Sequence, residues 1–392
     1  MKNNLVNRPP LTAYRLLLFP ISIIFWIVVV LRRLAHQKGW LRSTTFDIPT
    51  VCVGNLNLGG TGKTPHVEYI TRFLSQHYQI AILSRGYGRK TKGYINTHET
   101  KNLSSRGYGR KTKGYINAHE TINLSSEMIG DEPMQYVTKF PNVEVAVCEK
   151  RKTGIEKLVE KNPKLDVIVL DDAYQHLSVN YSVRILLTEY HYPFFNDFLF
   201  PVGTLRDYRN AAKYSDIILV TKCPESLSQE EKTTFLQKLK PRQHQSVFFT
   251  KISYKLQVTS NKLQVTSNNS NTNNCQLSIV NCQLSIVNCQ FLLVSGIANP
   301  APLVKFLENK YGKIHHLRFA DHHSFTKKDI EKIIKTKNRL GGDSCVILTT
   351  EKDAMRLQLF ANMPEYITVP IEIEFIENET AFQEKLLSLL FQ

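Results

Sequence analysis

The sequence lacks the cysteine pairs that a disulfide framework or a zinc site would need. Its cysteines are odd in number and scattered, and none forms a C-x-x-C pair matched by a second Cys or His pair. Three of them, Cys275, Cys282 and Cys289, recur every seven residues only because the surrounding segment repeats. We therefore interpret the thiols as reduced and cytosolic.

Acidic residues are scarce relative to basic ones. Lys and Arg number 50 against 34 Asp and Glu, which gives a formal net charge of +16. This surplus predicts an anionic partner such as nucleic acid, anionic lipid or a phosphorylated substrate. No RNA-binding or helix-turn-helix signature is present, which argues against nucleic acid. The 392 residues, 42 % of them hydrophobic, suffice for two or three domains and exclude a disordered or collagen-like chain.

One long apolar run is present, at residues 16–31. As a helix it would measure about 24 Å, against about 30 Å for the hydrocarbon core of a bilayer. Arg32 and Arg33 follow it directly and no small-x-small cleavage site is visible, so a cleaved signal peptide fits poorly. We expect residues 1–35 to form a membrane anchor that either spans the bilayer or is only embedded in it. A buried core helix is the alternative. Basic residues on both sides suit an anionic membrane surface.

Beyond the anchor, short β-branched runs alternate with helical stretches, which is typical of βαβ units and a parallel sheet covered on both faces. Further strand-like runs with a helical candidate between them, at 303–310, predict a second, smaller α/β domain. We place the boundary near residue 225, which gives domains at 36–225 and 226–392. The first set of runs is 48–53, 79–83, 143–148, 167–170, 183–187 and 217–221, and the second is 291–295 and 345–349.

Two internal repeats interrupt this pattern. Residues 84–104 recur almost identically at 105–125, so 84–125 is interpreted as a tandem duplication in which one copy serves the site and the other loops out. Residues 255–290 repeat KLQVTSN and then CQLSIVN with a period of seven. Because these units carry β-branched residues and no e/g charges, we expect an inserted β-prone or disordered loop rather than a coiled coil.

A glycine-rich loop, GNLNLGGTGKTP at residues 54–65, lies between a predicted strand and a helical pattern. In such loops backbone N–H groups surround phosphate oxygens, Lys63 reaches the β- and γ-phosphates, and Thr64 offers its hydroxyl to Mg²⁺. The usual G-x-x-x-x-G-K-[ST] pattern has glycine where this chain has Asn57. A chance glycine-rich turn is the alternative. The candidate nucleotide-binding residues are Asn57, Gly59, Gly60, Thr61, Gly62, Lys63 and Thr64.

A second element of a nucleotide site is an apolar strand that ends in two acids, at residues 165–172. This Walker B-like arrangement brings a carboxylate to the threonine of the loop through Mg²⁺. We assign Asp171, together with Thr64, to the metal, and give Asp172 a supporting catalytic role. A solvated strand-to-loop turn is the alternative.

Six motifs occur in a fixed order along the chain. They are GNxxxGGTGKTP (54–65), SRGYGR (84–89, repeated at 105–110), GDEP (130–133), DDxxQH (171–176), GxLR (203–206) and DHHxF (321–325). Together they resemble the tetraacyldisaccharide 4'-kinase (lipid A 4'-kinase) family. The resemblance extends from the anchor to about residue 355, and that family also lacks the glycine at the position of Asn57. It implies a P-loop-containing nucleoside triphosphate hydrolase-like three-layer α/β/α fold with a mainly parallel sheet.

The resemblance implies an ATP-dependent lipid kinase. The enzyme would transfer the γ-phosphoryl group of ATP, with Mg²⁺, to the 4'-hydroxyl of a tetraacyldisaccharide 1-phosphate, forming the 1,4'-bisphosphorylated product. The partner would be a membrane-embedded anionic glycolipid, with no nucleic acid and no obligate protein partner. The catalytic domains would lie on the cytoplasmic side of the inner membrane, attached peripherally or by the single anchor.

By the same resemblance, Asp131 is the base that receives the hydroxyl proton, oriented or assisted by His322. An Asx-turn or N-cap is the alternative for Asp131. A surface or core histidine is the alternative for His322, and the neighbouring His323 leaves the choice of ring open. Lys63 and Asp172 complete the catalytic set.

Further residues are expected to bind the substrate. Arg85 and Tyr87 are candidates to clamp phosphate or sugar, and their duplicates Arg106 and Tyr108 could take the same role. We favour the first copy because it follows its strand without interruption. The remaining site-lining candidates are Gln175, His176 and Arg206, with a solvated basic face as the alternative for Arg206.

Two other classes of protein compete with the kinase. A membrane-attached P-loop NTPase switch would use the same loop and acid, but the TKCP at residues 221–224 lacks the Asp of a guanine-reading N/T-K-x-D motif. A non-enzymatic basic membrane or nucleic-acid binder would leave the intact Gly62-Lys63-Thr64 and Asp171 unexplained.

Overall fold

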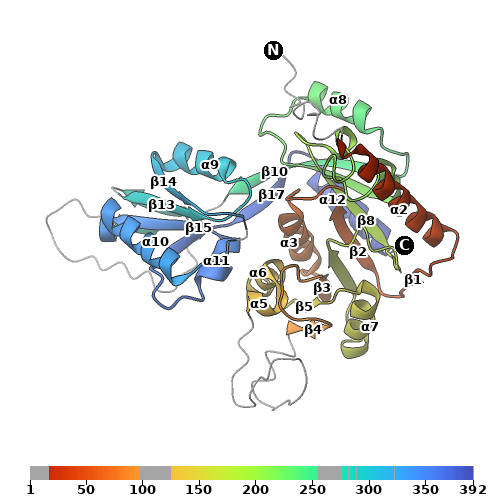
Figure 1. Cartoon of the computed structure of the whole chain (residues 1–392), viewed down its shortest axis with the longest axis horizontal. Helices are drawn as coiled ribbons and strands as arrows, with labels where there is room; N and C mark the ends of the chain where they lie inside the picture. Colours follow the sequence, from red (N-terminus) through yellow and green to blue (C-terminus); the bar gives the residue numbers. More distant parts are fainter. Residues whose placement is uncertain are drawn as a thin grey trace. The chain divides into compact units, whose positions relative to one another are not determined.

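The computed structural model describes residues 17–97, 125–254, 276–280, 283–287, 289–321 and 323–391 (Figure 1). Two compact units make up the chain. Unit 1 contains Met1–Ile252 and Ile373–Gln392, and unit 2 contains Ser253–Glu372. The two crossings between the units run through strands β10 (Ser246–Tyr254) and β17 (Ile371–Phe375), which are neighbours in one sheet.

Unit 1 is built on a nine-stranded sheet in the order β17-β10-β9-β8-β2-β6-β3-β5-β4. The ladders from β10 to β5 are parallel, and the β4–β5 ladder at the edge is antiparallel. The predicted βαβ rhythm and parallel sheet are thus confirmed. The other strands are β2 (Thr50–Asn55), β3 (Ile80–Ser84), β4 (Ile95–Asn96), β5 (Glu144–Val147), β6 (Val167–Asp171), β8 (Val183–Glu189) and β9 (Ile217–Thr221), with a separate pair β1 (Thr44–Thr45) and β7 (Val179–Asn180).

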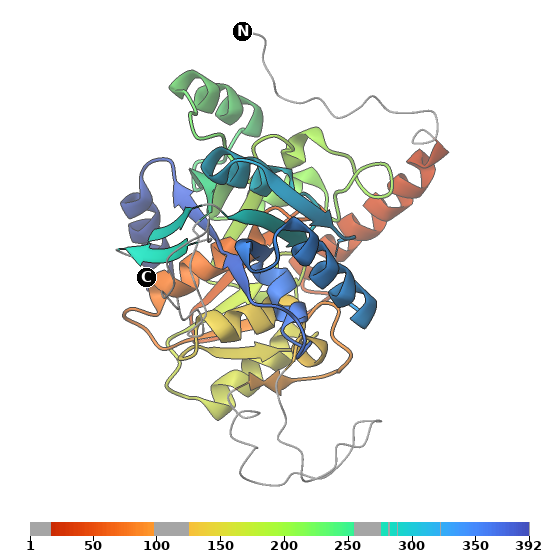
Figure 2. The ribbon, with the colours of Figure 1, turned by 90° about the vertical axis from the view of Figure 1, so that its left-hand side faces the viewer.

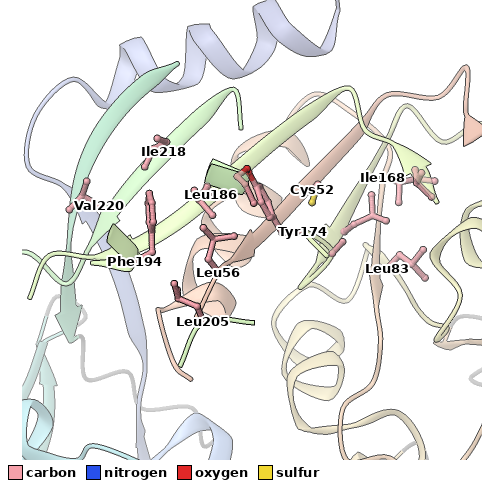
Figure 3. Close-up of a cluster of buried hydrophobic side chains, with 14 of the residues drawn as sticks. Cys52, Leu56, Leu83, Ile168, Tyr174, Leu186, Phe194, Leu205, Ile218 and Val220 are labelled. Carbon is pink, nitrogen blue, oxygen red and sulfur yellow. The ribbon is translucent and has the colours of Figure 1, made fainter. Parts of the chain in front are cut away.

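Helices cover both faces of this sheet, so unit 1 has three layers. Consecutive residues of β2 show the period of two, because Cys52 packs on one face and Val51 and Val53 on the other. The first face carries α7 (Arg151–Lys161), α8 (Gln229–Leu239) and the apolar cluster drawn in Figure 3. The second carries α3 (Lys63–Leu74), α6 (Asp131–Lys139) and α12 (Glu379–Leu390), with the short α5 (Ser126–Ile129) directly before α6.

The boundary expected near residue 225 differs from the structure. Residues 226–252 stay in unit 1 because β10 extends the sheet in parallel with β9, from Ser246 opposite Ile217 to Phe249 opposite Val220. The C-terminal residues return to unit 1 as well, since Phe382 of α12 is fully buried in its core. The second domain is therefore an insertion between β10 and β17.

Helix α2 (Phe19–Gln37) is the predicted anchor, and it is the one helix in the described part of the chain that is long and apolar enough to cross a membrane. The alternative of a buried core helix is wrong, because Ser22 and Arg33 are its only buried residues. Its exposed side chains are mostly large and apolar, including Ile24 at 62 % and Trp26 at 47 % exposure. Figure 2 shows α2 along the outside of unit 1.

Unit 2 contains a four-stranded parallel sheet in the order β14-β13-β15-β16. Part of the repetitive tract at 255–290 forms an antiparallel pair, β11 (Gln276–Val280) with β12 (Gln283–Val287), as its β-prone sequence predicted. The remaining elements are β13 (Gln290–Ser295), α9 (Ala301–Tyr311), β14 (Ile314–Arg318), α10 (Lys327–Leu340), β15 (Cys345–Thr350), α11 (Glu351–Leu357) and β16 (Tyr366–Val369).

Candidate active site

The predicted phosphate loop connects β2 to α3 at the carboxyl edge of the sheet. Gly62 precedes the helix with φ +86°, a left-handed conformation that favours glycine, and α3 begins at Lys63. The first N–H groups of a helix have no partner within it, so they are available to an anion, and the helix dipole favours negative charge there. A Cβ built on Gly59 or Gly60 would meet nothing within 4 Å, so this stretch of backbone is open.

Lys63 extends back over the end of β2. Its Nζ donates to Oδ1 of Asn55 at 3.2 Å and lies 3.7 Å from a carboxylate oxygen of Asp172. These contacts hold the cation above the carboxyl edge of the sheet, beside the helix N-terminus. Contact between Lys63 and the β- and γ-phosphates stays a prediction.

The two acids end β6, which pairs with β2 so that Asp171 lies opposite Val53. Their side chains take different directions. Asp171 is buried and accepts a hydrogen bond from Ser84 Oγ at 3.3 Å, whereas Asp172 has φ +48° and pairs with Arg206 and Lys63.

The electrostatics of the two acids are opposite. Burial raises the pKa of Asp171 to about 6, and the charges of Asp172 and Glu132 add to the effect. Burial would also raise the pKa of Asp172, but the hydrogen bond from Arg206 and the charge of Lys63 hold it well below the ordinary value. Asp171 is thus a buried carboxylate with a raised pKa, and Asp172 is an ionised carboxylate paired with two cations.

A loop at residues 197–208 holds the phosphate loop from the side. The amide of Asn57 donates to Asp197 at 2.9 Å, and the Leu58 N–H donates to the Thr204 carbonyl. Asn57 therefore uses its side chain to attach the two loops, a contact that the glycine of the usual pattern cannot make. Contact between Asn57 and the nucleotide stays a prediction.

The phosphate loop is also held from below by the end of β9. Thr221 Oγ1 donates to the Thr61 carbonyl at 2.9 Å, and Lys222 Nζ donates to the Gly60 carbonyl at 2.5 Å and to Glu189 at 2.7 Å. The carbonyls of Gly60 and Thr61 thus accept hydrogen bonds from residues at the end of β9. The TKCP segment thus supports the phosphate loop.

The predicted substrate motifs contact each other. A Cβ on Gly130, which has φ +98°, would lie 2.9 Å from the carbonyl oxygen of Tyr87, so the GDEP turn packs against the SRGYGR turn. Asp131 then begins α6, with Gly130 and not Asp131 at the N-cap, so the N-cap alternative for Asp131 is wrong. The effect of Glu132 on the pKa of Asp171 indicates that this turn lies near the acids.

A family model described as tetraacyldisaccharide-1-P 4'-kinase matches residues 14–104 and 99–390. The chain belongs to this family. The two matched segments overlap at 99–104, inside the tandem duplication. The resemblance noted in the sequence is confirmed, and the exposed apolar helix α2 together with the family indicates association with a membrane.

Two relatives and one solved structure are similar over nearly the whole chain. The tetraacyldisaccharide 4'-kinase of Flavobacterium johnsoniae is 36 % identical over 376 residues, covering 96 % of this chain and 97 % of the relative. That of Bacteroides thetaiotaomicron is 37 % identical over 368 residues, covering 92 % and 89 %. The crystal structure of LpxK from Aquifex aeolicus in complex with ATP shares the fold, with a TM-score of 0.65 and 23 % identity over 96 % of this chain and 100 % of that one.

The structure gives the surroundings of three predicted substrate residues, Arg206, Gln175 and His176. Arg206 forms a two-pronged pair with Asp172 and donates to Asn55 Oδ1 at 2.6 Å, so it is no solvated basic face. The Gln175 amide donates to the Asn55 carbonyl at 2.7 Å. Burial, with the charges of Arg151 and Arg85, lowers the pKa of His176 to about 4, which keeps its ring neutral. Whether these residues contact the substrate stays a prediction.

The remaining predicted residues differ in their surroundings. The side chains of Arg85 and Tyr87 are exposed, Tyr87 at 73 %, and make no hydrogen bond within the described residues. His322, like the duplicates Arg106 and Tyr108, lies outside the described residues. His323 stacks on Phe319 and bonds Asp329 at 3.0 Å, so its ring is part of the packing of unit 2.

Three residues of this site were not predicted. Asn55 accepts hydrogen bonds from Lys63, Gln175 and Arg206. Its sequence signals were its place in the GNxxxGGTGKTP motif and a polar residue at the end of an apolar strand. Arg151 is fully buried and donates to the Asp171 carbonyl at 3.0 Å. Lys222 was read only as part of a missing guanine motif.

His66 makes the stability of unit 1 depend on pH. It is buried in α3 with Nδ1 2.7 Å from the Gly62 carbonyl and Nε2 2.9 Å from Thr250 Oγ1, and burial lowers its pKa to about 4 despite the first contact. Below about pH 6.5 the His66 ring is protonated in the unfolded chain but stays neutral in the folded chain. The free energy of unfolding therefore falls as pH drops toward 4.

We expect this histidine to contribute about 2 kcal/mol to the difference in unfolding free energy between about pH 7.5 and pH 5. Urea unfolding of the wild type and His66→Gln at both pH values measures it, because the variant should lose that part of the difference. The exposed His77→Gln is the control and should retain the wild-type difference. Equal pH dependence in His66→Gln and the wild type would contradict the assignment.

Proposed function

We propose that this chain transfers the γ-phosphoryl group of ATP to the 4'-hydroxyl of a tetraacyldisaccharide 1-phosphate. The observation that carries the proposal is the convergence of Lys63, Asp171 and Asp172 beside the N-terminus of α3. Phosphoryl transfer depends mainly on positioning and on neutralising charge, and this cluster supplies an anion-binding helix end, a cation and a buried carboxylate. Two relatives that carry the name of this activity match the chain almost from end to end.

Mg²⁺ fits the residues present. Oδ1 of Asp171 is buried and has no hydrogen-bond partner among the described residues, so it is free to hold a cation. Thr64 lies on the first turn of α3, where the loop sequence places the metal-binding hydroxyl. One carboxylate and one hydroxyl, completed by phosphate oxygens and water, are a typical set for this ion. The ion supplies neutralisation of charge on the phosphate oxygens.

Acceptor activation is assigned to Asp131. It begins α6 beside the SRGYGR turn, where the exposed Arg85 and Tyr87 are available to a phosphate or sugar. A carboxylate in this position accepts the proton of the attacking 4'-hydroxyl, and His322 is assigned to orient it or share the proton. Arg binds phosphate with two parallel hydrogen bonds, which suits Arg85 to the anionic headgroup.

The location that we propose is the cytoplasmic face of the inner membrane. An acceptor with four acyl chains remains in the bilayer, so the enzyme must work at its surface. The exposed apolar side chains of α2 match the hydrocarbon region, and the surplus of basic residues favours anionic lipid.

The test is transfer of label from γ-labelled ATP to a tetraacylated disaccharide 1-phosphate in detergent micelles. A labelled bisphosphorylated lipid would support the proposal. Tight ATP binding without product, both in this protein and after deletion of residues 105–125, would overturn the acceptor assignment. Product only after the deletion would show that the duplicated copy blocks an otherwise competent site.

A further inference from the structure

We propose that the C-terminal end of α2 couples insertion of this helix into an anionic bilayer to the geometry of the phosphate site, with Arg33 as the positioning residue. The inference rests on the proposed function, because the bilayer is where the acceptor lies. It goes further by giving the anchor a role in the site itself. The contacts that carry it start at two consecutive arginines.

Arg33 is 6 % exposed in a helix that is otherwise largely exposed. Its Nε lies 3.1 Å from both carboxylate oxygens of Asp207, and Nη2 donates to one of them. Its guanidinium carbon also lies between 5.2 and 6.0 Å from the ring centroids of Tyr174, Tyr208 and Tyr214. A planar group held by a fork and by rings has a fixed orientation, so the helix and Asp207 move together.

The residue before Asp207 is Arg206, which holds the phosphate site. Arg206 pairs with Asp172 and donates to Asn55 Oδ1 at 2.6 Å. A shift of Asp207 therefore displaces the neighbouring Arg206. Arg206 pairs with Asp172, and Asp172 also contacts Lys63.

Arg32 provides a second route to the same place. Its Nη2 donates to the carbonyl of Gln175 at 3.3 Å, and the Gln175 amide donates to the carbonyl of Asn55 at 2.7 Å. Asn55 is fully buried, and its Oδ1 also accepts from Lys63 at 3.2 Å. Arg32 and Arg33 of α2 are thus both connected to Asn55, through Gln175 and through Asp207 with its neighbour Arg206.

The N-terminal half of α2 holds the other end of the 197–208 loop. Ser22 Oγ donates to the Leu199 carbonyl at 2.9 Å, and Phe19 packs edge-on against Phe198 with 6.2 Å between centroids. The same loop attaches to the phosphate loop through Asp197 and Asn57. The loop is therefore held by the helix on one side and by the phosphate loop on the other.

Packing between α2 and this loop leaves an open groove. Its volume is about 420 Å³, and it is lined among others by Ile23 and Trp26 of the helix and by Phe198 and Tyr208 of the loop. The groove gives the helix room to change its seating when a bilayer covers its apolar face. A lipid-dependent change in seating is then transmitted through Asp207 and Gln175.

Coupling between two binding events is reciprocal. We expect vesicles of phosphatidylglycerol and phosphatidylethanolamine to tighten binding of a fluorescent ATP analogue to the full chain by about five-fold or more, and ATP to tighten vesicle binding by the same factor. In Arg33→Met both effects should be lost, while binding to vesicles without nucleotide remains. Arg42→Met, an exposed arginine just beyond α2, is the control and should keep both effects.

The thermal midpoint, the transfer assay and vesicle binding together distinguish coupling from an effect on membrane anchoring or on folding. The thermal midpoint shows whether Arg33→Met is folded, and if it is not, the exchanged pair Arg33→Asp with Asp207→Arg is tested for rescue. In the transfer assay, Arg33→Met should lower kcat about ten-fold at saturating lipid. Loss of vesicle binding in parallel with activity, or unchanged mutual tightening in a folded Arg33→Met, would overturn the proposal. The ATP-analogue readout needs no acceptor, so it stands even if the proposed acceptor is wrong.

Discussion

Lys63→Ala is expected to lower kcat for phosphoryl transfer by about 1,000-fold, because it removes the cation nearest the phosphate loop where negative charge is carried in the transition state. The lysine is already held in place by Asn55 and Asp172. It therefore needs little reorganisation when the substrate binds. Single-turnover transfer from γ-labelled ATP measures the loss directly.

The fold should survive this substitution. Asp172 keeps its two-pronged pair with Arg206, so this carboxylate is not left without a cation, and the thermal midpoint should change little. Lys164→Ala, at an exposed position in the same unit, is the matched control and should leave kcat unchanged. Transfer by Lys63→Ala at close to the wild-type rate would remove Lys63 from its assigned role.

The strands of the sheet could be predicted because buried parallel strands have a simple signature. Runs of β-branched residues bounded by turns predicted β2, β3, β5, β6, β8 and β9, and the structure has each of them. The signature failed at β10 and β17, which lie on either side of the inserted second unit. Their pairing joins residues far apart in the sequence, and local pattern carries no information about such a pairing. That is why the domain boundary was placed too early.

The site was predictable where a motif fixes the backbone and unpredictable where side chains meet across the fold. The glycine-lysine-threonine turn and the strand that ends in Asp171 were located from spacing alone. Arg206 was expected to line the site, but its pair with Asp172 was not foreseen, because it forms only when the 197–208 loop returns to the end of β2. The buried Arg151 and the convergence on Asn55 depend on which strands are neighbours, and this is a property of the topology.

Burial explains how two adjacent acids take different roles. Asp171 is buried at the sheet edge beside Ser84, whereas Asp172 itself has a left-handed backbone conformation and pairs with Arg206. A sequence shows two aspartates with equal chemistry, whereas the fold gives one a raised and the other a lowered pKa. The raised pKa belongs to the residue assigned to the metal, whose buried Oδ1 has no hydrogen-bond partner in the described part of the chain and therefore suits a cation.

Asp131→Asn should separate acceptor activation from nucleotide binding. We expect kcat to fall between about 100-fold and 10,000-fold, because an amide cannot accept the proton of the attacking hydroxyl. The Kd of an ATP analogue should stay near the wild-type value, since the phosphate loop lies on a different turn. The helix should persist, because Gly130 provides the N-cap geometry of α6 and asparagine has nearly the same size as aspartate.

The matched control is Glu127→Gln, which neutralises an acid in the preceding helix α5 whose exposed side chain pairs only with Lys90 among the described contacts. It should retain wild-type transfer, which would show that the loss in Asp131→Asn is not a general effect of removing negative charge near the substrate turn. A parallel loss of ATP binding in Asp131→Asn would place this residue in nucleotide binding. Normal transfer by this variant would require another base, because the hydroxyl proton must still leave as the phosphoryl group arrives.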